Sequence, residues 1–271
     1  MRSFGGTQGF YKHPSTVCGG EMRFSVFVPD AAKDAPLPVV YFLAGLTCTE
    51  ETFAAKSGAQ RAASKLGLIV VTCDTSPRSA RYPGDDEHWD FGQGAGFYVD
   101  ATEAPWSSTY RMETYVTEEL RTLVETNFPI ATGARGIFGH SMGGHGALTL
   151  SLRHPDLYKS VSAFAPIVAP SQVPWGEKAF SRYLGDDRAK WREHDACELV
   201  RKTQLPSEIL IDQGTSDKFL TRELRPELFE AACRDAGQAL KLRRHEGFDH
   251  SYYFIQTFVK SHLKHHAKLL G

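Results

Sequence analysis

A short glycine-rich segment near the middle of the chain constrains its fold more than any other feature. Residues 139–143 read Gly-His-Ser-Met-Gly, with a short predicted strand at 135–139 before them and a helical pattern at 143–153 after them. A strand that turns sharply into a helix at a G-x-S-x-G segment holds its central residue in a strained backbone conformation. Side chains at the flanking positions would collide with the neighbouring strand and helix, so glycine is needed there. The pattern therefore predicts a strand–turn–helix unit that presents Ser141 at the carboxyl end of a sheet.

Strand and helix patterns alternate along the rest of the chain. We expect strands at 22–28, 39–43, 68–73, 161–164, 209–211 and 240–243, and helices that run to about 66 and over 112–127, 225–235 and 252–269. The run at 39–43 is apolar on both faces, which indicates a central strand, whereas 22–28 alternates and indicates an antiparallel strand near the sheet edge. This order predicts one α/β domain over residues 1–271, with a mostly parallel central sheet flanked by helices.

Two segments follow neither pattern. Residues 76–106 are rich in proline, glycine, aspartate and aromatic residues, and residues 166–206 carry several prolines and two tryptophans. Long loops inside compact domains are usually functional or packed as compact elements of their own. We therefore expect both segments to be excursions from the single domain, the second covering one end of the sheet.

The composition excludes several classes of protein. With 31 Lys and Arg against 32 Asp and Glu, the chain lacks the basic excess of a general nucleic-acid binder. No apolar run reaches the roughly 18–20 residues of a membrane helix, and the chain begins without an apolar signal core. The five cysteines (18, 48, 73, 197 and 233) are irregularly spaced and are expected to be free thiols. We expect a cytoplasmic protein with no nucleic-acid or membrane partner, no metal and no cofactor.

The serine of the glycine-rich segment is predicted to be a nucleophile. Its hydroxyl would lie at a helix N-terminus, where the dipole favours developing negative charge, but it needs a base within hydrogen-bond reach. The alternative is a glycine-rich helix start with a capping serine. No phosphate-binding glycine motif is present. His140 and His145 lack a third ligand at metal-like spacing, so we interpret them as packing residues or supports of the site.

The C-terminal part of the chain offers one well-placed base. His250 follows a strand pattern and precedes the last helix, on a loop at the carboxyl end of the sheet, although it would also suit a helix cap. His262, His265 and His266 lie within a helix rich in Lys and His, and we interpret them as a solvent-exposed face. His250 is therefore the predicted base.

Three carboxylates are candidates for the acid that orients the base. Asp217 lies on the loop after the strand at 209–211 and fits best, because the acid must approach the imidazole from another loop. Asp212, at the end of that strand, is the runner-up and suits a structural acceptor. Asp249 adjoins His250 in the chain and would usually point elsewhere.

The position of the serine also predicts two backbone donors for an oxyanion. One is the N–H of Met142, the residue after the nucleophile, and the other comes from the loop after the early central strand, where we choose Leu46. Gly45 would let that backbone turn inward. The same loop brings Cys48 near the site, where it is either a small buried hydrophobic residue or a reactive thiol.

Several longer runs resemble the esterase D family of S-formylglutathione hydrolases along nearly the whole chain. They are residues 45–50 (GLTCTE), 89–102 (WDFGQGAGFYVDAT), 138–147 (FGHSMGGHGA), 160–167 (SVSAFAPI) and 249–255 (DHSYYFI). The run at 89–102 is far more specific than G-x-S-x-G. The resemblance implies an α/β-hydrolase fold with Ser141, Asp217 and His250 as catalytic triad and with Leu46 and Met142 as oxyanion donors.

The resemblance also implies an activity and a setting. The activity is hydrolysis of the thioester S-formylglutathione to glutathione and formate through a formyl-serine, within glutathione-dependent formaldehyde detoxification. The setting is a cytoplasmic homo-oligomer, commonly a dimer. Alternatives are a general short-chain carboxylesterase, an acyltransferase that excludes water, and a non-catalytic hydrolase-fold binding protein.

Such a substrate requires two kinds of pocket. A formyl group is small, so we expect a narrow acyl pocket walled by aromatic residues, which the sequence offers in Trp89, Trp175 and Phe248. The carboxylates of glutathione need cationic neighbours, and the candidates are Lys178, Lys218, Arg78 and Arg81.

Overall fold

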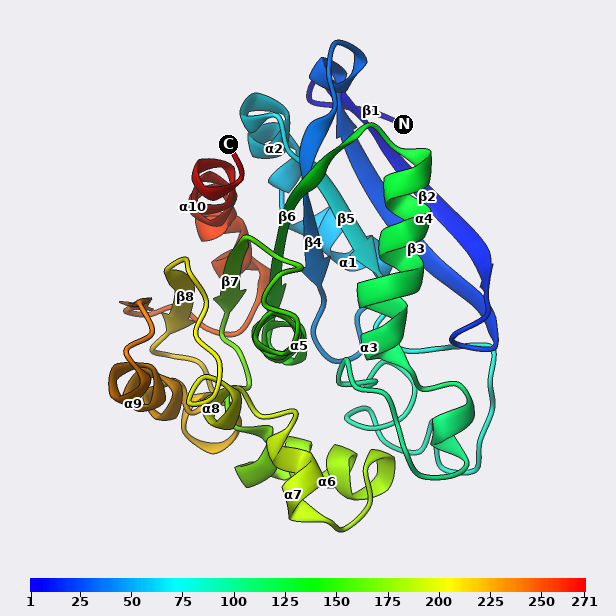
Figure 1. Cartoon of the computed structure of the whole chain (residues 1–271), viewed down its shortest axis with the longest axis vertical. Helices are drawn as coiled ribbons and strands as arrows, with labels where there is room; N and C mark the ends of the chain where they lie inside the picture. The colour runs from blue at the N-terminus through cyan, green and yellow to red at the C-terminus, as the bar shows by residue number, and fades with distance from the viewer.

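One nine-stranded sheet runs through the computed structural model, which describes residues 1–271 (Figure 1). In sheet order the strands are β1 (Arg2–Ser3), β2 (Gly6–Ser15), β3 (Gly20–Pro29), β5 (Ile69–Cys73), β4 (Leu37–Leu43), β6 (Ile130–His140), β7 (Ser160–Phe164), β8 (Ile209–Gly214) and β9 (Leu240–His245). The first four pair in antiparallel fashion, and all pairs from β5 to β9 are parallel. The predicted mostly parallel α/β fold is confirmed.

Helices cover both faces of this sheet. Figure 1 shows α4 (Arg121–Asn127) to the right of the central strands and α2 (Ala59–Leu66) and α10 (Tyr252–Leu270) to their left. α5 (Met142–Arg153) packs on β4, β6 and β7, and α1 (Glu50–Lys56) packs on β3 and β5. All residues of α5 except the last are buried, and small side chains at its start let it approach the sheet closely. Two further helices are α3 (Met112–Thr114), which continues through a π-helical turn at Tyr115–Leu120 into α4, and α9 (Pro226–Ala236).

The amino-terminal strands differ from expectation. β1 and β2 were not predicted, because the sequence of β2 (GTQGFYKHPS) has no alternation of apolar and polar residues. Its strand conformation comes from pairing with β3 over its whole length, from Gly6↔Pro29 to Ser15↔Gly20. β3 is antiparallel as predicted, but it is the third strand from the edge of the sheet.

The prediction that the histidines of the last helix face solvent is wrong. His262 and His266 are completely buried and His265 is half-buried, because α10 packs on the sheet and residues four apart share one helix face. Ser162 Oγ lies 2.8 Å from His262 Nδ1 and 2.9 Å from His266 Nε2. These hydrogen bonds satisfy polar atoms that would be costly to bury alone.

Both unusual segments pack against the carboxyl end of the sheet. Residues 76–105 form no helix or strand, yet Phe91, Phe97 and Tyr98 are at most 1% exposed. The later segment carries α6 (Pro174–Tyr183), α7 (Arg188–Arg192) and α8 (Ala196–Leu199), with α6 and α7 at the bottom of Figure 1. No helix in the chain combines the length and the apolar character needed to cross a bilayer.

Candidate active site

Ser141 sits on a sharp turn between β6 and α5. Its backbone has φ 58° and ψ −118°, a strained conformation for a residue with a side chain. A Cβ at Gly139 would lie 2.1 Å from the carbonyl oxygen of Gly143, and one at Gly143 would lie 1.9 Å from that of Leu43. Both contacts are shorter than any side chain tolerates, which confirms the need for glycine on both sides of the serine.

Backbone hydrogen bonds hold the strained serine in place. Its N–H donates to the Phe164 carbonyl at 2.9 Å, and its own carbonyl accepts from His145 N–H at 2.9 Å and Ile167 N–H at 3.2 Å. β7 and the chain beyond it therefore clamp the turn from the side opposite β4. The hydroxyl is presented at the first turn of α5, where the helix dipole favours negative charge.

Asp217 and His250 meet although they are far apart in the chain. His250 Nδ1 lies 2.5 Å from Asp217 Oδ2. The Asp217 side chain is fully buried, and its other oxygen accepts the Phe219 N–H at 2.9 Å. A carboxylate on Nδ1 fixes the ring and its tautomer, and leaves Nε2 free to exchange a proton with a nucleophile.

The two other carboxylates are engaged elsewhere. Asp212 accepts from both Arg243 Nε at 2.5 Å and Arg243 Nη2 at 2.6 Å, on the side of the sheet where α10 packs. Asp249 accepts hydrogen bonds from the backbone N–H and the hydroxyl of Ser251, just before α10. Neither carboxylate makes a hydrogen bond to His250.

His250, the predicted base, lies close to the turn that carries Ser141. The ring of His250 is 4.4 Å, centre to centre, from that of His140, which directly precedes Ser141. No hydrogen bond joins Ser141 Oγ to His250 in this structure, and this contact is often loose in unliganded enzymes of this type. Burial and the neighbouring His250 hold the pKa of His140 well below its usual value, so His140 is a neutral packing partner.

The loop after β4, residues 44–48, lies close to Ser141. We name it the oxyanion loop. A Cβ at Gly45 would lie 3.2 Å from Cβ of Ser141, so this residue brings the backbone close to the nucleophile. The next N–H, that of Leu46, makes no hydrogen bond to another backbone group. Met142 begins α5, and the first N–H groups of a helix have no partner within the helix. Both donors therefore remain open toward a ligand.

Aromatic side chains continue from the base into a groove. Phe219 packs 5.1 Å from His250, Trp175 packs 4.7 Å from Phe219, and Trp89 packs 5.4 Å from Trp175, centre to centre. The groove has a volume of about 440 Å³ and is lined by Trp89, Asp90, Pro174, Trp175, Lys178, Lys218, Phe219, Arg222 and Glu223. The structure thus brings together four of the predicted pocket residues and adds Phe219 and Arg222. Phe219 was not predicted from the sequence, although its position two residues after Asp217 could have indicated that it lies near the site.

The remaining predicted pocket residues lie elsewhere. Phe248 packs in a separate aromatic cluster with His245, Phe254 and Phe258. Arg78 binds the Asp74 carboxylate and the Cys48 carbonyl, and Arg81 is exposed without an ion pair. Cys48 is half-buried, and burial raises the pKa of its thiol, which favours the unreactive protonated form.

Comparison with known proteins gives matches over the whole chain. The Esterase family model, described as "Putative esterase", matches residues 15–265. The chain is 51% identical to the S-formylglutathione hydrolases of Rattus norvegicus and Paracoccus denitrificans, covering 100% of this chain and 96% of each relative. The solved S-formylglutathione hydrolase of Agrobacterium tumefaciens superimposes with a TM-score of 0.98 at 52% identity, covering 100% of this chain and 98% of that one.

More distant structures share the fold alone. A ferulic acid esterase aligns with a TM-score of 0.77 at 20% identity, over 99% of this chain and all of that one. Full-length identity above one half is a much stronger relation than a common fold. The chain belongs to the S-formylglutathione hydrolase family of esterases.

Proposed function

We propose that this protein hydrolyses the thioester S-formylglutathione to glutathione and formate, with Ser141 as nucleophile, His250 as general base and Asp217 as the orienting acid. One observation carries the proposal. The strained Ser141 lies close to Gly45 of the oxyanion loop, and the ring of His250, whose Nδ1 hydrogen-bonds Asp217, packs 4.4 Å from that of His140, the residue before Ser141. Membership of the family supplies the substrate.

In the first half of the reaction the serine takes the formyl group. Ser141 Oγ attacks the formyl carbon while its proton passes to Nε2 of His250, and Asp217 stabilises the imidazolium. The N–H groups of Leu46 and Met142 stabilise the negative oxygen of the tetrahedral intermediate. The carbon–sulfur bond then breaks, and the sulfur leaves as a thiolate that takes the proton from His250. A thiol of pKa near 8.5 is a good leaving group.

In the second half water replaces glutathione. His250 removes a proton from the water, whose oxygen attacks the formyl carbon of the acyl-serine. The same two backbone donors stabilise the second tetrahedral intermediate. Collapse of this intermediate returns the proton to Ser141 Oγ and releases formate, so the enzyme is regenerated without a cofactor.

The aromatic groove is our candidate for the glutathione part of the substrate. Lys218 is the groove cation without an ion pair, whereas Lys178 is bound to Asp90 at 2.8 Å and Arg222 Nε lies 3.4 Å from Glu223 Oε1. Carboxylates of the tripeptide would pair with these cations. The indole rings of Trp89 and Trp175 would cover the peptide and exclude water from the thioester.

We also propose a cytoplasmic homo-oligomer, most simply a dimer. All five cysteines are free thiols, which a reducing compartment preserves. β1 pairs only with Gly6 and Thr7, so most of the outer edge of β2 is open for a second copy. Light scattering of the purified protein tests the assembly.

A substrate panel tests the proposed function. We expect kcat/KM for S-formylglutathione to exceed that for S-acetylglutathione and for 4-nitrophenyl butyrate, because the site is built for a small acyl group on a glutathione leaving group. Higher kcat/KM for the butyrate ester would instead assign a general carboxylesterase. Transfer of the formyl group to an added alcohol without release of formate would assign an acyltransferase.

A further inference from the structure

Tyr98 joins the aromatic segment at 89–102 to the oxyanion loop. Its side chain is 1% exposed, and its hydroxyl donates a hydrogen bond of 2.9 Å to the carbonyl oxygen of Ala44. Ala44 directly precedes Gly45 and Leu46, so this bond acts two residues from the proposed oxyanion donor. Burial holds the pKa of Tyr98 well above its usual value, which keeps the proton on the hydroxyl as a donor.

The other side of the same ring rests on the helix that carries the second donor. A Cβ at Gly146 would lie 2.6 Å from Cδ2 of Tyr98, so glycine at that position of α5 lets the ring lie directly on the helix backbone. His145 reinforces the contact, because its Nε2 lies 2.9 Å from the carbonyl oxygen of Phe97. Tyr98 therefore spans the space between α5, which begins at Met142, and the oxyanion loop.

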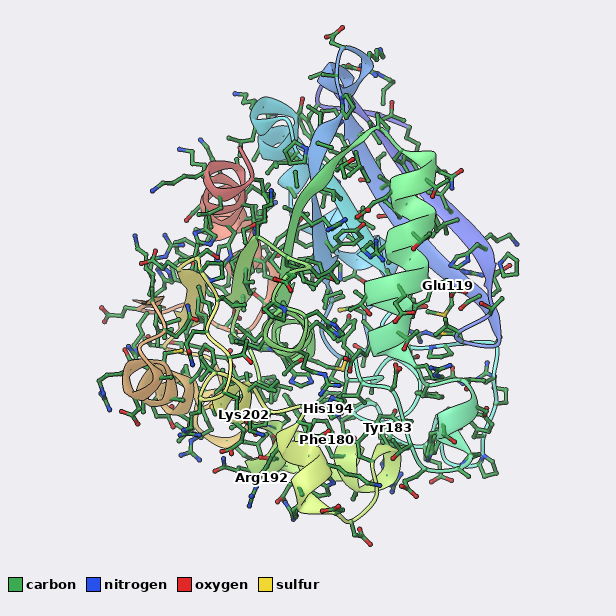
Figure 2. All side chains as sticks on the ribbon, in the orientation of Figure 1. Glu119, Phe180, Tyr183, Arg192, His194 and Lys202 are labelled. Carbon is green, nitrogen blue, oxygen red and sulfur yellow. The ribbon has the colours of Figure 1, made fainter.

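The segment that carries Tyr98 is itself fixed. The hydroxyl of Tyr183 in α6 (labelled in Figure 2) donates to the Ala95 carbonyl at 3.0 Å and accepts from Gly92 N–H at 3.1 Å. The carbonyl of Gly94 accepts Thr47 N–H at 2.9 Å, which is a second link to the oxyanion loop. Tyr98 thus rests on a rigid support, and its backbone φ of 52° is imposed by that support.

We infer that Tyr98 is a positioning residue that sets the separation between the two oxyanion donors, the N–H groups of Leu46 and Met142. The inference rests on the proposed function and deepens it. Donors must lie 2.7–3.1 Å from the developing oxyanion, and loss of one donor typically costs about 10²–10³ in rate. A displaced donor costs less than a missing one. The expected loss for Tyr98→Phe is therefore about tenfold in kcat.

The test compares Tyr98→Phe with Tyr110→Phe. Both tyrosines are 1% exposed, but the hydroxyl of Tyr110 has no hydrogen-bond partner, so its removal is a matched chemical change without a lost bond. With S-formylglutathione, we expect Tyr98→Phe to lower kcat about tenfold with KM within twofold of wild type. Tyr110→Phe is expected to keep both constants.

Two inhibitors separate positioning from general loosening. A trifluoromethyl ketone that adds to Ser141 forms an oxyanion, so its Ki should rise in Tyr98→Phe about as much as kcat/KM falls. S-methylglutathione has no carbonyl on sulfur, so its Ki should stay unchanged. If both Ki values rise equally, or if Tyr98→Phe matches Tyr110→Phe in kcat, the positioning role is refuted.

Gly146→Ala approaches the same contact from the helix. The new methyl group displaces the ring of Tyr98, so this variant should show the same lowered kcat with little change in KM. This variant also tests the positioning role of Tyr98 if the Tyr98→Phe variant does not fold. An unaltered kcat in a folded Gly146→Ala would overturn the inference. Failure of the proposed function itself appears differently, as S-formylglutathione turnover that survives Ser141→Ala.

Discussion

At the scale of single residues, Asp212 in β8 and Asp217 after it have different partners. Asp217 faces the imidazole of His250, whereas Asp212 faces Arg243 on the α10 side of the sheet. Loop position in the sequence favours Asp217 over Asp212 as the orienting acid, and the structure brings Asp217 to His250. The partners of Asp212 lie on β9 and α10 and were not evident from its neighbours in the chain.

Exchanging each aspartate for its amide distinguishes their roles. Asp217→Asn should lower kcat by about 10⁴ with the fold intact, because the amide favours the wrong imidazole tautomer. Asp212→Asn should instead lower the free energy of unfolding by about 2 kcal/mol through its weakened bonds to Arg243. Steady-state kinetics of both variants measures kcat, and urea unfolding measures the free energy of unfolding. A rate loss confined to Asp212→Asn would move the acid assignment to that residue.

At the residue scale, the sequence predicts a feature well when residues close together in the chain determine it. The glycines at 139 and 143 leave few alternatives to a sharp turn, which places Ser141. The groove is assembled from three distant segments of the chain that carry Trp89, Trp175 and Phe219, and no spacing in the chain predicts that they meet. Phe248 is predicted to be one of the aromatic walls of the acyl pocket, yet its side chain packs toward α10.

At the scale of elements, α10 is held to the sheet by a buried polar network. Ser162 on β7 bonds both His262 and His266, and Ser160 Oγ lies 2.7 Å from His266 Nδ1. The Lys- and His-rich composition of this helix suggested an exposed face. This face of α10 is buried because its histidines have partners on β7 and β8. Tertiary contacts therefore override what the composition of the helix indicates. β2 is a comparable example, since it is a strand only because it pairs with β3 over ten residues.

Removing the central hydroxyl of this network tests its contribution. Ser162→Ala leaves two buried ring nitrogens without a partner, and we expect the free energy of unfolding to fall by about 1–3 kcal/mol with kcat unchanged. Ser151→Ala is the control, because this buried hydroxyl bonds only the Leu148 carbonyl of its own helix. Equal unfolding free energies for the two variants would show that the network adds no stability.

At the scale of the whole molecule, the fold buries neutral histidines. Burial lowers the pKa of His145 to about 3 and that of His194 to about 4. The unfolded chain takes up protons at these residues near pH 6.5, whereas the folded chain does not. Their contribution to stability is therefore complete above pH 6.5 and is lost as the pH falls toward 4.

This difference predicts acid sensitivity. Between pH 7.5 and pH 5, the two histidines together should lower the free energy of unfolding by about 4 kcal/mol, to which other groups add. Urea unfolding at both pH values measures the change. His145→Gln should show a shallower dependence, smaller by about 2 kcal/mol over this range. A free energy that does not change with pH in the wild type would contradict the burial of neutral histidines.

Of the three scales, the sequence predicts the overall fold most completely. The alternation of apolar strands with helices, and the order Ser141, Asp217, His250 along the chain, already describe an α/β-hydrolase. The three predicted site residues each follow a different strand of one sheet. The ends of these parallel strands lie at the same edge, so the residues come together there. What the order leaves open is the lining of the groove above that edge.

The central claim is that hydrolysis passes through a formyl group on Ser141. It is tested most directly by measuring kcat/KM for S-formylglutathione in Ser141→Ala, with circular dichroism as the control for folding. The account predicts that kcat/KM falls by about 10⁴ or more, because the remaining groups of a triad act only through the nucleophile. Turnover near the wild-type value in the folded variant would contradict it.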